Sequence, residues 1–154
     1  IEIAGYKYNM TDIQASIGLA QLERFDDEIL SKRERLFQIY INEFKNEADF
    51  IIPNFFDENK RNNFHLFPLR IKNFNESQRD LLIKKMAEKK IALNVHFIPL
   101  PMLSLYKNLG YDIKDFPNAF DTYQNLVTLP IYSKLSEEDA LYVARELKKS
   151  YLEF

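Results

Sequence analysis

A long helix is predicted near the start of the chain by apolar residues that recur every three or four positions. These residues are Leu22, Phe25, Ile29, Leu36, Tyr40 and Phe44. Thr11 is expected to cap the helix, because Gln14 lies three residues later and completes a capping box. We expect the helix, counted from its cap, to span residues 11–46 with a bend near Asp26 and Asp27.

The first turns of this predicted helix carry small or apolar residues nearly all round. They are Ile13, Ala15, Ser16, Ile17, Gly18, Leu19 and Ala20. A helix of this composition is typical of one that is buried on several sides. We expect a domain outside this chain, or a second subunit, to supply much of the cover.

Strands are predicted by period-two patterns that turn residues delimit. The segments are residues 50–53, 64–71, 91–98 and 126–131. The third alternates most clearly, with apolar residues on one face and, on the other, Asn94 and His96. Pro68 favours a sheet edge or a bulge for its part of the second segment, because proline has no N–H to donate.

Further helices are predicted between and after these strands. A second capping box, Asn75 with Gln78, opens a helix that ends near Lys89. The later signals are a stop at Gly110 for residues 102–109, a start at Phe116-Pro117-Asn118, and an N-cap at Ser136. The inner faces are expected to bury Leu82 and Met86 in the earlier helix and Leu141, Ala144, Leu147 and Tyr151 in the last. The whole order predicts a small α+β domain, with helices over a sheet of three or four strands.

Composition limits what the chain can be. Its 154 residues suffice for one domain, and 21 basic against 23 acidic residues leave a net charge of -2. We therefore expect no nucleic-acid partner, and no stretch is apolar and long enough to cross a membrane. The absence of cysteine excludes disulfides, and a cytoplasmic location is the default. A first residue Ile1 within an apparent strand indicates a piece of a longer protein.

Few residues have the pattern of a catalytic site. With two histidines and three glycines we expect no metal site and no phosphate-binding loop. Lys7, Tyr8 and Asn9 precede a capped helix N-terminus, where an anion could bind, although most such termini bind no ligand. His96 either contacts a substrate or is a hydrogen-bonded structural residue, and His65 favours the structural role more strongly.

Aromatic residues offer a second kind of contact. Tyr6, Tyr8 and Tyr106 could stack on a sugar or a base, or simply pack in the protein. The pattern alone does not choose between the two.

The segment Gly5-Tyr6-Lys7-Tyr8-Asn9-Met10-Thr11, followed by the helix Asp12–Leu22, resembles the segment that DegT/StrS-type sugar aminotransferases carry after their large catalytic domain. Later matches follow in order: Phe64–Phe67, Val95–Leu100, Tyr106, Gly110-Tyr111, Phe116–Ala119, Leu129–Tyr132 and Leu135–Asp139. The resemblance therefore covers essentially the whole chain. Lys7 stands where the family usually has Asn, and Asn9 where it usually has Arg. These replacements resemble the 4-amino-4-deoxyarabinose-type enzymes, which act on 4-keto sugars.

The resemblance implies the small C-terminal domain, residues 1–154, of a fold-type-I transferase dependent on pyridoxal phosphate (PLP). It implies a cytoplasmic homodimer whose own N-terminal catalytic domain carries the Schiff-base lysine, so no catalytic residue is expected here. Residues 1–10 become an active-site loop and residues 11–46 a linking helix. Glutamate would give its amino group, through pyridoxamine phosphate, to a keto group of a nucleotide-linked sugar.

Site residues follow from the same resemblance. Asn9 and Lys7 are expected near the phosphate of the PLP in the partner subunit. Tyr8, His96 and Tyr106 are expected to contact the substrate.

Three functions remain open. The first is a sugar-nucleotide aminotransferase for polysaccharide or glycoconjugate biosynthesis, of which this piece alone is inactive. The second is a sugar dehydratase of the same family, which uses the same cofactor with His in place of the lysine. The third is a non-catalytic dimerisation or binding module.

Overall fold

The computed structural model describes residues 8–154. It contains an antiparallel sheet with the strand order β1-β2-β3, where β1 is Phe50–Ile51, β2 is Phe67–Ile71 and β3 is Leu126–Leu129. The α-helices are α1 Asp12–Glu23, α2 Ser31–Phe44, α3 Glu76–Glu88, α4 Ser104–Asn108, α5 Pro117–Gln124 and α6 Glu137–Tyr151. Single turns of other helix types lie at Phe25–Leu30, Leu100–Met102 and Ile113–Asp115. The predicted α+β class is confirmed.

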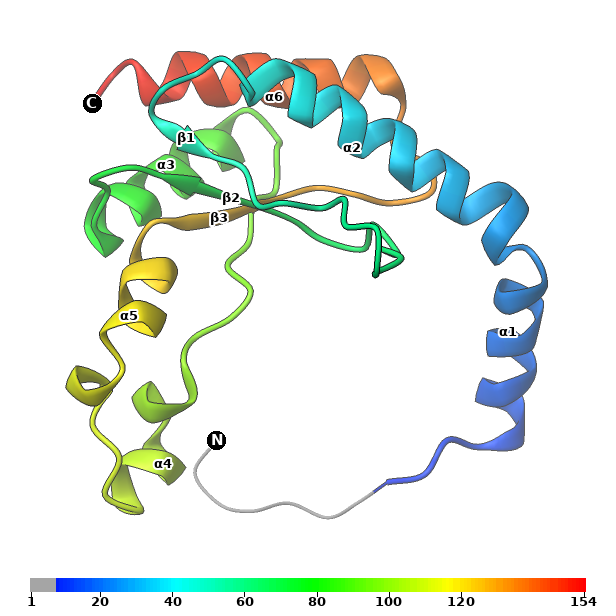
Figure 1. The fold of residues 1–154 in the computed structure, drawn as a ribbon, viewed down its shortest axis with the longest axis horizontal. Helices are drawn as coiled ribbons and strands as arrows, with labels where there is room; N and C mark the ends of the chain where they lie inside the picture. The colour runs from blue at the N-terminus through cyan, green and yellow to red at the C-terminus, as the bar shows by residue number, and fades with distance from the viewer. Residues whose placement is uncertain (1–7) are drawn as a thin grey trace.

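The core lies between one face of the sheet and the helices α2, α3 and α6 (Figure 1). Alternate residues of β2 point into it, so Phe67, Leu69 and Ile71 are fully buried beside Val127 and Leu129 of β3. The buried faces of the three helices supply Leu36, Phe37, Tyr40, Phe44, Leu82, Met86, Ala144 and Leu147. The predicted inner residues of the second capped helix are thus confirmed.

The predicted long helix is present but divided. A π-helical turn, Phe25–Leu30, separates α1 from α2 at the position where the sequence predicted a bend. An extra residue per turn changes the direction of a helix, and α1 accordingly leaves the body of the molecule at an angle to α2 (Figure 1). Arg24 and Glu28 form an ion pair of 2.6 Å across this junction.

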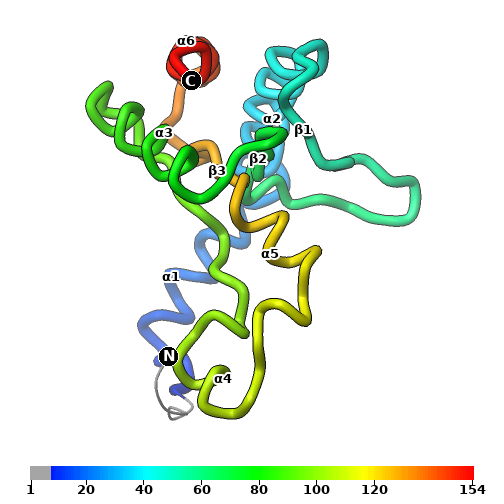
Figure 2. The backbone as a smooth tube through the Cα atoms, turned by 90° about the vertical axis from the view of Figure 1, so that its left-hand side faces the viewer, coloured from blue at the N-terminus to red at the C-terminus, as the bar shows by residue number. Residues whose placement is uncertain are grey.

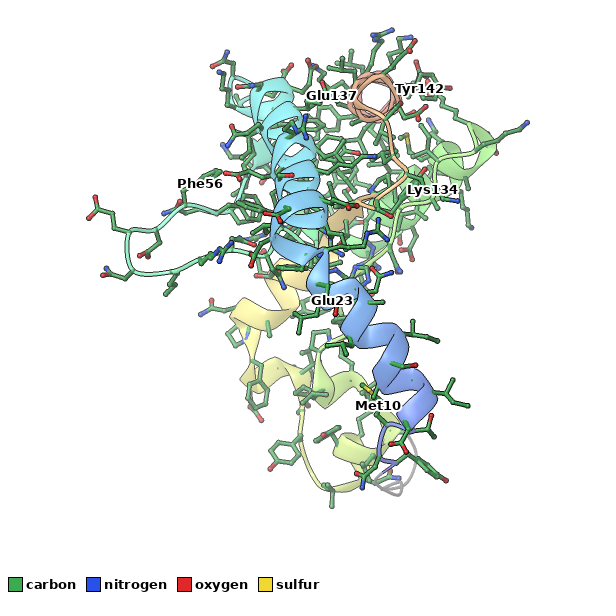
Figure 3. All side chains as sticks on the ribbon, turned by 90° about the vertical axis from the view of Figure 1, so that its right-hand side faces the viewer. Met10, Glu23, Phe56, Lys134, Glu137 and Tyr142 are labelled. Atoms are coloured by element: carbon green, nitrogen blue, oxygen red, sulfur yellow. The ribbon has the colours of Figure 1, made fainter. Side chains whose placement is uncertain are left out.

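Helix α1 has no buried residue within the described part of this chain. Figure 3 shows it, with Met10 and Glu23 near its two ends, extending beyond the packed body. The apolar residues Ile13, Ile17 and Leu19 are all exposed. The described residues therefore supply none of the cover that the composition of this helix predicted.

One strand prediction was wrong. Residues 91–98 form no strand and meet β3 only at Asn94, whose backbone exchanges hydrogen bonds of 3.3 and 2.7 Å with Thr128. An antiparallel ladder would next place Ala92 opposite Pro130, which has no N–H to donate. The side-chain oxygen of Asn94 accepts a hydrogen bond of 2.8 Å from the N–H of Val95, the next residue along the chain.

Pro68 lies in the central strand β2, but at a part of it that β1 does not reach, so its nitrogen faces a locally open edge of the sheet, as predicted. Its partner Thr128 directs both backbone groups toward Asn94, so Pro68 and Thr128 face each other as a pair without hydrogen bonds. On its other side, β1 reaches only Arg70 and Ile71. Pro68 therefore occupies the sheet without removing a ladder hydrogen bond.

Helix ends agree well with the predictions. Thr11 with Gln14, Asn75 with Gln78 and Ser136 with Asp139 each form a capping box. Gly110 follows α4 with a φ of 91°, which favours glycine, and Pro117 opens α5. Leu141 was wrongly assigned to the core: it is 37% exposed, and Ala140 and Val143 are buried in its place.

Candidate functional site

The residues before α1 present polar groups to the surroundings. Tyr8 is 87% exposed, and Asn9 is exposed beside it. Thr11 accepts a hydrogen bond from the N–H of Gln14 at 3.3 Å, and its own N–H donates to the Gln14 side chain at 2.9 Å. The remaining N–H groups of the first turn have no acceptor within the helix, so this end attracts anions, although Asp12 adds one negative charge. Lys7 and Tyr6 lie outside the described residues.

A second group of predicted residues lies on residues 96–124, which we call the arm. The arm leaves the sheet after Asn94 and returns to β3 through α5. Tyr106 of α4 is half-buried, with its ring edge toward Tyr111 at 6.2 Å between centroids. Both predicted substrate residues after Tyr8, His96 and Tyr106, therefore belong to one segment of the structure.

His96 lies at the root of the arm and is half-buried. Its ring meets Phe97 edge to face at 4.6 Å. The Nδ1 atom is buried and has no hydrogen-bond partner among the described residues, so the hydrogen-bonded structural role is not supported. His65, which was expected to be structural, is exposed.

The two groups of predicted residues lie apart within one chain. Figure 1 shows α1 on one side of the molecule and α4 with α5 on the other. Figure 2 shows that α1 and the arm both extend to the same side of the sheet, away from α6. A single chain therefore does not join Asn9 with Tyr106 in one pocket.

Sequence reasoning missed the residues that hold the arm in place. Arg70 of β2 points away from the core and donates to Asn125 at 2.9 Å and to Asp121 of α5 at 2.6 Å. Arg79 of α3 donates to the carbonyl oxygen of Tyr123 at 2.6 Å. The alternation in β2 was a usable signal, because it places Arg70 opposite the apolar face, but nothing in the sequence identified its partners.

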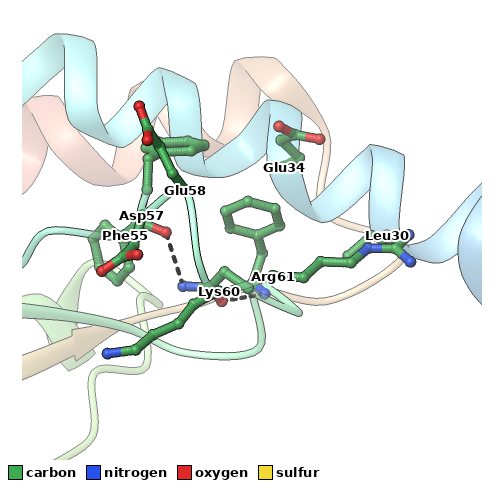
Figure 4. A pocket seen from close by; sticks show the side chains of 10 residues that line it. Leu30, Glu34, Phe55, Asp57, Glu58, Lys60 and Arg61 are labelled. Atoms are coloured by element: carbon green, nitrogen blue, oxygen red, sulfur yellow. Dashed lines mark hydrogen bonds between the residues drawn. The ribbon is translucent and has the colours of Figure 1, made fainter.

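A cavity of about 530 Å³ lies between the loop of residues 54–64 and the start of α2 (Figure 4). Leu30, Phe55 and Phe64 are among its apolar lining, and Arg61 on its rim is paired with Asp26 at 2.6 Å. It contains none of the predicted site residues. Among the described residues, no cluster of side chains is suited to a metal ion.

No described helix has the length and apolar character needed to cross a membrane.

Comparisons with known proteins give a consistent family. A model described as the DegT/DnrJ/EryC1/StrS aminotransferase family matches residues 1–148. The chain is 42% identical to protein MJ1066 of Methanocaldococcus jannaschii, over 94% of this chain and 38% of that protein. It is 35% identical to the spore coat polysaccharide biosynthesis protein SpsC of Bacillus subtilis, over 90% of this chain and 36% of that protein.

A third relative is named for its reaction. This is the UDP-4-amino-4,6-dideoxy-N-acetyl-beta-L-altrosamine transaminase of Campylobacter jejuni, 29% identical over 90% of this chain and 36% of that protein. The chain therefore spans less than two fifths of the length of each of these relatives.

A solved structure has the same fold. Spr1654 of Streptococcus pneumoniae, assigned as a sugar aminotransferase and solved in its PLP-form, superimposes with a TM-score of 0.89 at 36% identity. The match covers 96% of this chain and 37% of that one.

Proposed function

Because the chain belongs to the DegT/DnrJ/EryC1/StrS aminotransferase family, we propose that it is the C-terminal part of a PLP-dependent sugar-nucleotide aminotransferase. The whole protein transfers an amino group, with glutamate as the donor, to a keto group of a nucleotide-linked sugar for polysaccharide or glycoconjugate biosynthesis. It works in the cytoplasm as a homodimer. The observation that carries the proposal is the match over residues 1–148, together with a fold shared with Spr1654 at a TM-score of 0.89.

The described residues fit one end of the cofactor. PLP carries a phosphate, and the exposed Asn9 with the free N–H groups of α1 forms a donor set suited to an anion. Lys7 is the second residue that we propose for the phosphate. When bound, the cofactor supplies an electron sink for the transfer of the amino group.

The chain's own residues bind and orient in this proposal. Asn9 donates its side-chain amide to the phosphate of the PLP in the partner subunit. Tyr8 and Tyr106 present aromatic faces to the sugar nucleotide, which stacks well on such rings. His96, whose ring is half-buried at the root of the arm, is a hydrogen-bonding group for a hydroxyl group of the sugar.

The division of labour between two subunits is supported by the positions of these residues. Asn9 precedes α1, whose apolar surface no described residue covers, whereas His96 and Tyr106 lie on the arm across the molecule. A second subunit that covers α1 would bring the residues around Asn9 to its own cofactor. The linking role of residues 11–46 follows from the same arrangement.

The reaction is tested by the absorbance of the full-length protein with PLP. We expect the cofactor band to change when glutamate is added and to return when a 4-keto sugar nucleotide follows. A protein that binds PLP without the absorbance band of a lysine-bound cofactor points to the dehydratase, and one that binds no cofactor leaves the non-catalytic module.

The site is tested by Asn9→Ala in the full-length protein. Loss of one hydrogen bond to a charged group, about 1.5–3 kcal/mol, weakens PLP binding roughly tenfold or more. Asn59→Ala, in an exposed loop, is the matched control. Equal PLP affinities for the wild type and Asn9→Ala would remove Asn9 from the site.

A further inference from the structure

We propose that Arg70 and Arg79 form a clamp on the C-terminal end of α5, and that this clamp positions the arm for binding of the sugar nucleotide. The inference rests on the proposed function, because it takes the arm to carry substrate contacts. Arg70 is a positioning residue in this proposal: it acts through the arm and does not touch the substrate.

The two arginines reach the same helix end from different elements. Arg70 extends from β2, and Arg79 extends from α3. Their guanidinium groups meet α5 at Asp121, Tyr123 and the following Asn125. The end of a helix where carbonyl groups lack donors carries partial negative charge, so two cations there are favourable.

Arg79 is the buried half of the clamp. It is 3% exposed, and it donates to the carbonyl oxygen of Tyr123 at 2.6 Å while its guanidinium lies 4.6 Å from the centre of the Tyr123 ring. Asp80 pairs with the same guanidinium at 2.9 Å. A buried arginine with several partners fixes α5 against α3.

Arg70 is the half of the clamp that sets the orientation of α5. Its Nε donates to Asn125, which is 4% exposed, and its Nη2 donates to Asp121, which lies one helical turn away. Asn125 is also fixed by its carbonyl oxygen, which accepts from Ile71 at 2.9 Å. The planar guanidinium group of Arg70 thus donates to one residue within α5 and to the residue that caps it. Two such hydrogen bonds fix the orientation of α5, which a single contact would not.

The rest of the arm depends on these contacts. Outside α5, the described backbone pairs the arm with the sheet only next to its root, through Asn94 and Thr128. His96 follows that root by two residues, and Tyr106 lies between the root and α5. A change in the orientation of α5 therefore moves Tyr106 relative to the sheet.

The test uses the full-length protein with Arg70→Gln, Arg70→Lys and Asp121→Asn. We expect KM for a 4-keto sugar nucleotide to rise about tenfold in Arg70→Gln, because small misplacements of positioning groups have large effects. Lysine can reach only one of the two acceptors, so Arg70→Lys should fall between the wild type and Arg70→Gln. The change in cofactor absorbance with glutamate should stay as in the wild type.

Controls separate the clamp from general stability. Lys85→Gln removes an ion pair of 2.6 Å with Glu153, away from the arm. It should leave the KM for the sugar nucleotide and the KM for glutamate unchanged. Asp121 is more than half exposed, so Asp121→Asn keeps the test available if Arg70→Gln fails to fold. If the clamp acts as one unit, the double variant Arg70→Gln with Asp121→Asn should have nearly the same KM for the sugar nucleotide as Arg70→Gln alone.

Hydrogen exchange gives a readout that needs no activity. Amides of residues 96–116 should exchange about tenfold faster in Arg70→Gln than in the wild type, with no change in α6. Unchanged exchange in the arm, or a KM for the sugar nucleotide within twofold of the wild type, overturns the clamp. Equal rises in KM for glutamate and for the sugar nucleotide overturn it as well. A wild type without any response to glutamate or to the sugar refutes the proposed function, and the exchange result still decides whether the clamp exists.

Discussion

At the scale of single residues, Tyr40 combines a large apolar ring with one polar group in the centre of the core. It is fully buried, and its hydroxyl donates to the carbonyl oxygen of Pro130 at 3.0 Å. Burial raises the pKa of Tyr40 well above its ordinary value, so the hydroxyl remains a hydrogen-bond donor at neutral pH. Tyr40→Phe should lower the free energy of unfolding by about 1 kcal/mol, because the carbonyl loses its donor.

Urea unfolding of dilute protein checks this value, with Tyr142→Phe, at an exposed position of α6, as the control. Identical midpoints for Tyr40→Phe and the wild type would contradict the role of the hydrogen bond.

Residue-scale predictions succeeded where the cause is local. A capping box involves residues three apart, so Thr11, Asn75 and Ser136 could be identified as N-caps from the sequence. That the open edge at Pro68 lies within the central strand depended on the length of β1 and on the pairing of Thr128, which no local pattern contains. Contacts of Arg70 with residues more than fifty positions away were unpredictable for the same reason.

At the scale of elements, the failure at residues 91–98 shows what alternation leaves open. Ile91 and Leu93 are buried as the alternation predicted, but Phe97, predicted on the same face, is 73% exposed, and the segment is not a strand. Alternation indicates which side chains could share a face, whereas a strand also requires a neighbour with free backbone groups. The helices needed no such neighbour, and all of those predicted are present.

One pair of elements is joined by a carboxylate with two lysines. Glu146 of α6 accepts from Lys149 of the same helix at 2.7 Å and from Lys89, next to α3, at 2.8 Å. These hydrogen bonds lower the pKa of Glu146 from its ordinary value near 4.5 to about 2. A carboxyl with a lowered pKa stabilises the fold above its unfolded pKa, and this contribution is lost as the pH falls through the folded pKa.

Glu146→Gln should therefore be less stable than the wild type at neutral pH, and the difference should shrink between pH values of about 4.5 and about 2. Urea midpoints measured across this range give the comparison. Glu88→Gln, which removes an exposed carboxylate that makes no ion pair with a described residue, is the matched control. A difference between Glu146→Gln and the wild type that is independent of pH would show that the ion pairs do not stabilise the fold.

At the scale of the whole molecule, apolar residues gather where the described chain provides no cover. On α1 these are Ile13, Ile17, Leu19 and Leu22, and on the arm they are Phe97, Ile98, Leu100 and Leu109. α1 and the arm extend to the same side of the sheet (Figure 2). The composition of α1 predicted that this helix needs a partner. The apolar surface of the arm depends on how the arm is held against the sheet, and it was not predicted from the sequence.

The 154-residue chain on its own should self-associate, because exposed apolar surface of this extent is rare on soluble monomers. Sedimentation velocity over a range of concentrations should show a mass that rises with concentration. Ile17→Glu, in the middle of the uncovered helix, should shift the equilibrium toward monomer by roughly tenfold, since burying an unpaired charge costs at least 1.4 kcal/mol. Tyr142→Glu, on the exposed surface of α6, should leave the equilibrium as it is. A wild-type chain that stays monomeric at high concentration would show that α1 needs no cover, and a response to both variants alike would place the contact elsewhere.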